Sequence, residues 1–170
     1  MPVDTVGNAS SSGNAFNGNV AAFRVVASAA GALTSVGINI LTANAGHART
    51  AIYTDVAGSA GTLLAESSST LLVDNSWNDL PVTGVTIVAS TAYWLAYQID
   101  TVNTVVFFQS AGATDSFVSQ AYSAFPTAPT WSTTVFGPTN LRMTYTTPAA
   151  LPTIGLPSSN VVPVLTVVQW

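Results

Sequence analysis

The sequence predicts an all-β protein, an antiparallel two-sheet β-sandwich (jelly roll) with an extended arm at each end. Short runs of alternating apolar and polar residues recur about every ten residues, separated by turns rich in Gly, Pro, Asn or Ser. No segment combines helical periodicity with helix start and stop signals. The chain has 170 residues, of which 48% are hydrophobic and 6% charged. This composition favours one domain with a sizeable core over a disordered chain.

The chain is expected to have three parts: an arm over residues 1–19, a sandwich over residues 20–146 and a second arm over residues 147–170. Gly, Asn and Ser dominate the first arm, especially from Asn8 to Asn19. Such a composition is typical of a loop, or of an arm that becomes ordered on a partner surface.

Three expected strands open the sandwich: residues 20–27, 33–41 and 48–55. The first has Phe23 and Val25 on one face and Arg24 on the other. The second alternates most clearly, because β-branched residues occupy every second position from Val36 to Ile40. A period of two is typical of a strand that is buried on one face.

A Gly-rich loop over residues 56–61 ends the third strand. Shorter apolar runs follow, at residues 63–64, 71–73, 80–82 and 85–89. Residues 91–99 give the strongest expected strand, and the face that we expect to point inward carries Tyr93, Leu95, Tyr97 and Ile99. The opposite face carries Ala92, Trp94, Ala96 and Gln98.

Three more strands are expected at residues 105–109, 117–122 and 140–146, of which the second has the weakest pattern. Between them, residues 125–138 contain three prolines, which favour an ordered loop over a central strand. The last strand has Leu141, Met143 and Tyr145 on one face.

Several of these runs together resemble a known β-sandwich module. They are residues 51–55 (AIYTD), residues 61–66 (GTLLAE), Trp77 and residues 93–96 (YWLA). The pattern is similar to jelly-roll, carbohydrate-binding-like modules of phage structural proteins and secreted surface proteins. Ala60 stands where that module commonly has a proline. The resemblance implies a jelly roll over about residues 20–146, and it implies a role in assembly or in carbohydrate binding.

The second arm combines prolines at positions 148, 152, 157 and 163 with an apolar end. The prolines exclude a helix and favour an extended path. Its end has strong β propensity and no charge, so we expect it to be covered. It forms either an edge strand of its own sandwich or a strand added to a partner. The candidate partner-binding residues are Val161, Val162, Val164, Leu165, Val167, Val168 and Trp170.

Residues suited to catalysis are few, and we expect no enzymatic activity and no cofactor. His47 is the only histidine, and its position in a turn favours a surface role over that of a catalytic base. Asp55, Asp74 and Asp79 are the acidic residues considered for glycoside hydrolysis or for calcium, but acidic residues in turns usually bond their own backbone. Cysteine is absent, which excludes disulfides and thiolate metal sites.

Aromatic residues offer a different kind of site, because an exposed ring can stack on a sugar. Most aromatic residues in a sandwich belong to the core. Trp131, in a loop bounded by prolines, is the candidate glycan-stacking residue. The only cationic side chains apart from histidine are three arginines, too few for the basic surface that nucleic acid requires.

Two classes of function remain. The first is a non-enzymatic structural or assembly protein, such as a capsid decoration or head fibre on a virion surface, or a subunit of another extracellular assembly. Low charge favours it because little repulsion keeps copies apart, and so does the lack of lysines to protect sheet edges. Its expected partners are further copies, in a homo-oligomer, and other coat or particle proteins. The alternative is a carbohydrate-binding or adhesion module that binds surface glycans.

Two further expectations concern location. The first residues show no basic region followed by an apolar one, so no signal peptide is expected. No apolar run approaches the roughly 18 residues of a membrane span, so no membrane insertion is expected. The expected location is therefore a virion surface or an extracellular assembly.

Overall fold

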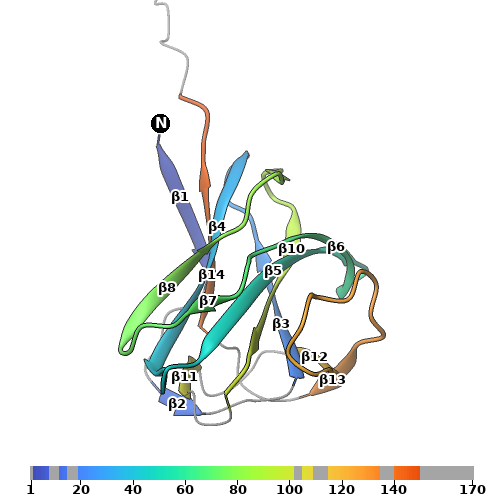
Figure 1. Ribbon diagram of the computed structural model, residues 1–170. Coiled ribbons are helices and arrows are strands. Elements are labelled where there is room, and N and C mark those ends of the chain that lie inside the picture. Colours follow the sequence, from blue (N-terminus) through green and yellow to red (C-terminus); the bar gives the residue numbers. More distant parts are fainter. Residues whose placement is uncertain are drawn as a thin grey trace, which may run out of the picture.

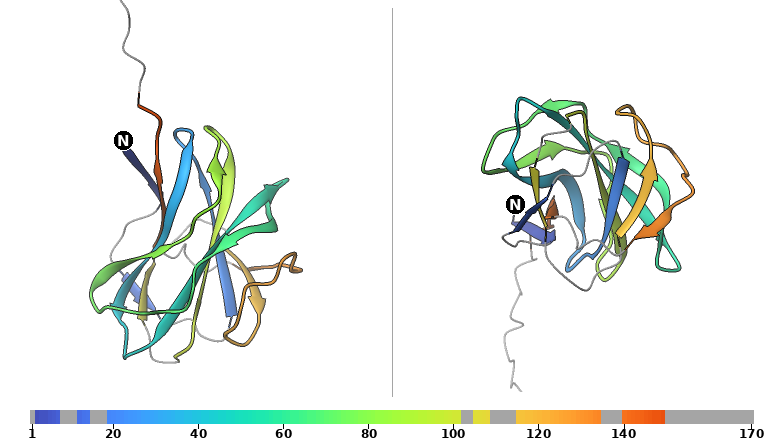
Figure 2. Two further views of the ribbon diagram at one scale, coloured as in Figure 1. Left: turned by 45° about the horizontal axis from the view of Figure 1, so that its top comes forward. Right: turned by 90° about the horizontal axis from the view of Figure 1, so that it is seen from below.

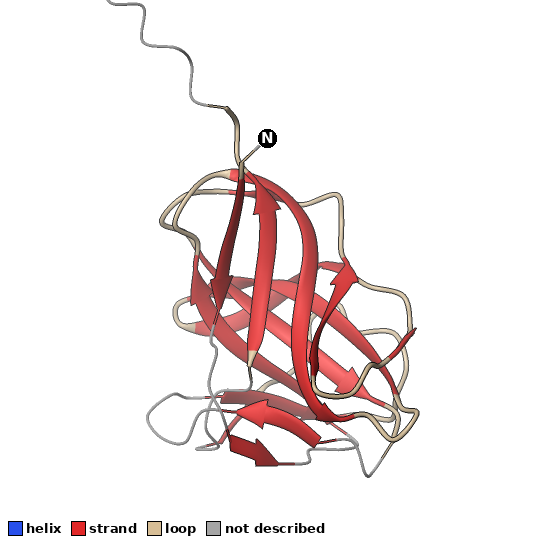
Figure 3. Cartoon of the chain, turned by 90° about the vertical axis from the view of Figure 1, so that its left-hand side faces the viewer, coloured by secondary structure: helices blue, strands red, loops and turns tan. Residues whose placement is uncertain are grey.

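The protein is an antiparallel β-sandwich (Figure 1). The computed structural model describes residues 2–7, 12–14, 19–101, 105–108, 115–134 and 140–149, which form strands and loops without a helix (Figure 3). The predicted all-β, two-sheet architecture is confirmed. The strands are β1 (Val3–Gly7), β2 (Ser12–Asn14), β3 (Asn19–Val26), β4 (Gly31–Thr42), β5 (His47–Val56), β6 (Ser59–Glu66), β7 (Thr70–Leu71), β8 (Ser76–Pro81), β9 (Thr86–Ile87), β10 (Ala92–Ile99), β11 (Val105–Phe108), β12 (Asp115–Ser119), β13 (Ser132–Thr134) and β14 (Leu141–Thr146).

The strands form two sheets, here called sheet A and sheet B. Sheet A has the order β1-β14-β4-β11-β2, and β8 and β9 also pair with β4. Sheet B has the order β13-β12-β3-β10-β5-β6, and β7 also pairs with β5. All these pairings are antiparallel. The long strand β4 is central to sheet A, because β14 and β8 both pair with its middle residues.

The main core lies between the two sheets. The expected inward face of β10 is confirmed, since Tyr93, Leu95, Tyr97 and Ile99 all belong to this core. They meet the alternating apolar residues of β4 and β14 from sheet A: Val36, Ile38, Ile40, Leu141, Met143 and Tyr145. The alternation in the sequence therefore identified this core correctly, because burial on one face imposes the period of two.

A second core covers the outer face of sheet B. Residues 120–131 cross this face without regular structure and place Phe125 and Trp131 against Tyr53 and Trp94. Tyr53 donates a hydrogen bond to the carbonyl oxygen of Pro126 at 2.9 Å. The expectation of an ordered loop over residues 125–138 is therefore confirmed for residues 125–131, whereas residues 132–134 form the short strand β13 and residues 135–138 lie outside the described residues. As a result β10 is buried on both faces.

The N-terminal arm expected over residues 1–19 needs a correction, because residues 3–7 form strand β1. This strand pairs with β14 from Val3 opposite Thr146 to Gly7 opposite Arg142. Side-chain contacts also hold it: Val6 packs against the main core, and the carboxylate of Asp4 accepts hydrogen bonds from Ser28 and, at 2.7 Å, from Tyr145. Residues 12–14 also pair, as β2, with β11.

The start of β1 and the end of β14 lie at the same end of the sandwich (Figure 2). The backbone N–H of Thr147 donates to the carbonyl oxygen of Pro2 at 2.9 Å. At this end Thr146 pairs with Ala32 of β4, and Ala32 pairs with Thr86 of β9. Three strands thus run side by side from the last residue of β14 to β9.

Candidate functional site

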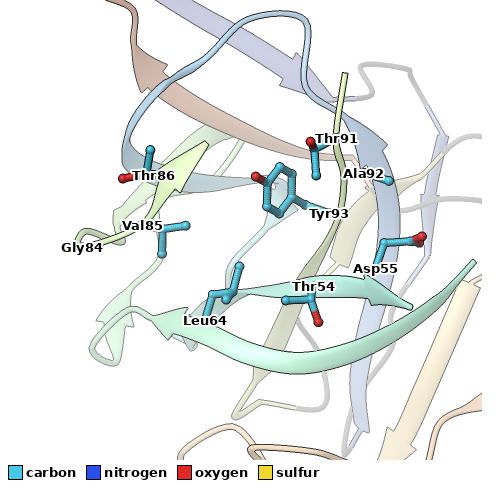
Figure 4. Close-up of a pocket in the computed structure, with 9 residues that line it drawn as sticks. All are labelled: Thr54, Asp55, Leu64, Gly84, Val85, Thr86, Thr91, Ala92 and Tyr93. Carbon is cyan, nitrogen blue, oxygen red and sulfur yellow. The ribbon is translucent and has the colours of Figure 1, made fainter. Parts of the chain in front are cut away.

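A cleft with a volume of about 470 Å³ opens at the end of the sandwich where β14 leaves it (Figure 4). Sheet B contributes β5, β6 and the start of β10, and sheet A contributes β9 with the loop before it. The lining residues are Thr54, Asp55, Leu64, Gly84, Val85, Thr86, Thr91, Ala92 and Tyr93. The volume is within the range of about 300 to 1,000 Å³ that is usual for ligand pockets.

The middle of the cleft is apolar. The side chains of Leu64, Val85 and Tyr93 point toward a common space, while the carboxylate of Asp55 points away from it (Figure 4). The Tyr93 hydroxyl accepts a hydrogen bond from the backbone N–H of Val88 at 3.0 Å, which fixes the ring at the inner side. Leu64 is 40% exposed and forms part of the outer wall. The cleft therefore suits an uncharged, largely apolar group, with threonine hydroxyls beside it.

The side chain of Asp55 stabilises the wall of the cleft through hydrogen bonds on the side of the wall that faces away from the cleft. Its Oδ1 accepts hydrogen bonds from Nε of Arg24 and Nε1 of Trp94, both at 2.8 Å, and its Oδ2 accepts one from the backbone of Gly58 at 3.2 Å. The hydrogen bond from Arg24 lowers the pKa of the Asp55 carboxyl below its ordinary value, and this effect is larger than the rise caused by partial burial. The hydrogen bonds from Trp94 and Gly58 lower this pKa further. This carboxylate ties β3, β10 and the β5–β6 turn together.

Two glycines shape the β5–β6 hairpin beside the cleft. Gly58 has a φ of +83°, a backbone conformation that favours glycine in a tight turn. Gly61 faces β5 so closely that a Cβ atom there would lie 2.5 Å from Oγ1 of Thr54 and 2.6 Å from Cγ2 of Val56. The hairpin can therefore pack against the lining residues only with glycine at position 61.

The other two candidate carboxylates are also engaged in structural contacts. Asp74 accepts a hydrogen bond from the backbone N–H of Ala43. Asp79 forms a bidentate ion pair with Arg142, in which Nε donates to Oδ1 at 2.8 Å and Nη2 donates to Oδ2. The guanidinium of Arg142 also stacks over Trp77, 4.3 Å from the ring centroid. Of the three, Asp55 alone lines the cleft.

His47 begins β5, and its side chain is 44% exposed. Its Nδ1 lies 3.1 Å from Oδ2 of Asp100, and its backbone N–H donates to Oδ1 of the same residue at 2.7 Å. This pair joins the start of β5 to the residue that follows β10. It lies at the end of the sandwich opposite to the cleft, because the cleft is lined by the last part of β5 and the first part of β10.

Trp131, the candidate glycan-stacking residue, is half-buried. Its ring meets Tyr53 edge to face, with the centroids 5.3 Å apart, and it packs against the second core. Its Nε1 is buried and has no hydrogen-bond partner within the described part of the chain. The ring thus has a packing role whether or not a glycan reaches it, and glycan stacking stays a prediction.

The candidate partner-binding residues Val161, Val162, Val164, Leu165, Val167, Val168 and Trp170 lie outside the described residues. Within those residues, no group of three or more His, Cys, Asp or Glu side chains could hold a metal ion. The same residues contain no helix long and apolar enough to cross a membrane.

Large apolar side chains are exposed at both ends of the sandwich, but more of them lie at the cleft end. Eight are exposed among the described residues. Five lie at or beside the cleft end, and we call this group the apolar pole: Val3, Val26, Val56, Leu64 and Val88. The other three, Leu41, Leu71 and Val73, lie toward the opposite end.

Sequence reasoning missed the cleft, because its lining comes from separate strands and turns that each have an ordinary local pattern. Only the pairing of those strands brings Leu64, Val85 and Tyr93 together. Neither a scan against protein-family models nor a search of curated proteins finds a match for this chain.

Proposed function

We propose that this protein is a non-enzymatic structural component that associates with further copies of itself or with other coat proteins, on a virion surface or in another extracellular assembly. The observation that carries the proposal is the apolar pole, where five of the eight exposed large apolar side chains gather. Exposed apolar side chains at one end of a molecule are suited to an interface between proteins in which a partner covers them together.

The distribution of charge supports the same proposal. Every cationic side chain of the sequence has an acidic partner within the chain: Arg24 with Asp55, Arg49 with Glu66, Arg142 with Asp79, and His47, when protonated, with Asp100. Internal pairing leaves the surface with few charges that could repel a second copy. It also leaves no basic side chain without an acidic neighbour, so association would depend on apolar contact and on strand edges.

The strand edges lack one usual form of protection. Natural sheets often protect their edges with lysine, and this chain contains none. Strand β1 is the outermost strand in the path of sheet A, and its one charged residue, Asp4, is engaged by Ser28 and Tyr145. An edge without a projecting charge is suited to pairing with another chain.

The test compares two pairs of substitutions in the full chain by sedimentation over a range of concentrations. Val56→Asp with Val88→Asp alters the apolar pole, where these residues are 60% and 54% exposed. Leu71→Asp with Val73→Asp is the matched control at the opposite end, with exposures of 57% and 62%. We expect association of the wild type and of the control, and at least about tenfold weaker association of the pole variant. A monomeric wild type would contradict association between copies, and an equal effect of both pairs would contradict the role of the apolar pole.

A second candidate function, carbohydrate binding or adhesion, is favoured by the cleft. An aromatic ring beside threonine hydroxyls, with no charged side chain pointing inward, suits an uncharged sugar. A glycan array with the wild type and with Val85→Trp, which fills the cleft, tests it. Saturable binding that the substitution removes would support this candidate, and a defined oligomer without sugar binding would support the first.

A further inference from the structure

We infer that the cleft of one copy receives the C-terminal apolar segment, residues 161–170, of a neighbouring copy. The inference names the contact through which the proposed assembly forms, and it therefore rests on the proposed function. Three observations carry it: the chemistry of the cleft, the place where the chain leaves the sandwich, and the length of chain between that place and the segment.

The chemistry of the cleft fits the segment. Leu64, Val85 and Tyr93 provide an apolar surface, and the one acidic residue of the lining, Asp55, is bonded to Arg24 and Trp94 outside the cleft. The segment reads VVPVLTVVQW, with seven Val, Leu or Trp residues and no charged side chain. Burial of apolar side chains is favourable in proportion to the area removed from water, and here no charged side chain would lose its hydration.

The chain leaves the sandwich beside the cleft. Thr146, the last residue of β14, pairs with Ala32, and Ala32 pairs with Thr86, which lines the cleft. Neighbouring strands are about 4.8 Å apart, so the exit lies about 10 Å from the cleft. The exposed Val3, which pairs with Thr146, belongs to the same end.

The length of the connection favours a neighbouring copy over the same copy. Thr147 still bonds to Pro2, so residues 148–160 separate the sandwich from the segment, thirteen residues with prolines at positions 148, 152 and 157. Proline-rich linkers act as semi-rigid spacers of about 3.1 Å per residue, or about 40 Å for thirteen residues. A linker is most effective when its length matches the distance that it has to span. This linker is about four times longer than the distance to the cleft of its own copy, so it is better suited to reaching the cleft of a neighbouring copy.

Disulfide crosslinking tests the inference. Because the chain contains no cysteine, only the introduced cysteines can form a disulfide. Full-length Thr86→Cys is mixed with full-length Leu165→Cys under mild oxidation, and the control mixture replaces Thr86→Cys by Val73→Cys, an exposed position at the opposite end. We expect a crosslinked heterodimer in the first mixture in large excess over the control. Adding Leu64→Asp to the Thr86→Cys chain should remove it.

The outcomes separate this inference from the proposed function. Oligomers seen by sedimentation without the crosslink would overturn the inference and leave the assembly function standing. A wild-type monomer at all concentrations would overturn the inference and the association between copies on which it rests. A double variant, Thr86→Cys with Leu165→Cys, adds a second criterion. A disulfide formed within one copy, at a yield independent of concentration, would assign the cleft to the segment of the same chain and overturn the inference. So would equal crosslinking in the control, or a glycan that binds the cleft in its place.

Discussion

The hydroxyl of Tyr145 donates a hydrogen bond to Oδ2 of Asp4 at 2.7 Å and joins two residues that are 141 positions apart in the chain. Tyr145 is fully buried in the main core, so its hydroxyl needs a partner, and β1 supplies one. Ser28 donates a hydrogen bond to the same carboxylate oxygen. These bonds, with the pairing to β14, make the first strand part of the sandwich.

Asp4 should make the stability of the protein depend on pH. The hydrogen bonds from Ser28 and then Tyr145 lower the pKa of its carboxyl in the folded state. Its contribution is therefore complete above the unfolded pKa of about 3.9 and is lost as the pH falls through the lower folded value. We expect Asp4→Asn to lower the urea midpoint at pH 7, and the difference from the wild type to shrink below about pH 4. An equal difference at pH 7 and pH 3 would show that the charge of Asp4 is not its source.

Removing Asp55 should cost more stability than removing its ion-pair partner. Asp55→Ala leaves three donors without their acceptor, including the indole of Trp94, and should lower the free energy of unfolding by about 2 to 3 kcal/mol. Arg24→Ala removes a side chain that is 44% exposed and should cost less than about 1 kcal/mol. Urea unfolding of both variants measures the difference. Equal losses would mean that the ion pair dominates.

Trp131→Ala should destabilise the fold whether or not the ring binds a glycan. The side chain packs against Tyr53 and fills part of the second core, so its removal should cost about 2 to 3 kcal/mol. Tyr53→Phe is the milder comparison, because it removes only the hydrogen bond to Pro126 and should cost about 1 kcal/mol. Thermal unfolding measures both. Unchanged stability of Trp131→Ala together with lost glycan binding would assign the ring to a ligand.

Gln98→Glu should be most harmful at neutral pH. Gln98 is fully buried, and its Nε2 donates to the carbonyl oxygens of Gln120 and Ala121 at 3.1 and 2.8 Å. A carboxylate there would face these two oxygens, so the folded state would favour the protonated acid and raise its pKa above the usual value of about 4.3. The stability of the variant is then highest below that value and is lost as the pH rises through the folded pKa.

Gln98→Met serves as the control for that variant, because it loses the two hydrogen bonds to Gln120 and Ala121 without gaining a titratable group, although it also loses the bond that Oε1 accepts from the backbone N–H of Ser123 at 3.1 Å. We expect a loss of about 3 kcal/mol or more for Gln98→Glu at pH 7, measured by urea unfolding, and a smaller loss at pH 4. The loss for Gln98→Met should change little between these values. If both variants lose the same amount at both pH values, the charge of the carboxylate has no role.

The sequence predicts the strands best where burial on one face imposes a local rule. Every second residue of β10 from Tyr93 enters the main core, and β14 follows the same rule. Trp94 and Ala96, on the other face of β10, are buried as well, and alternation cannot reveal this. The segment that covers them, residues 120–131, comes from a distant part of the chain, and no local pattern identifies what it covers.

Strand β1 and the cleft could not be predicted from the sequence, for a similar reason. Asp4 finds its partners 24 and 141 residues away, so its environment has no local signature in a segment rich in Gly, Asn and Ser. The Leu64, Val85 and Tyr93 side chains meet only because β6, the loop before β9 and β10 converge at one end. Gly58 could be predicted to end the strand, but the expected loop over residues 56–61 is wrong for residues 59–61, which belong to β6, and neither Gly58 nor Gly61 could be predicted to border a cleft.

The pairing of β1 with β14 has a mechanical consequence. Because Val3 lies opposite Thr146 at the end of the ladder where both segments emerge, tension applied between the two termini acts on one pair of residues at a time. The hydrogen bonds between β1 and β14 would therefore break one after another, at low force. Two strands pulled along their length would instead resist with all their hydrogen bonds at once. Stretching should therefore release β1 first, lengthening the molecule by a few residues while β10, covered on both sides, stays folded.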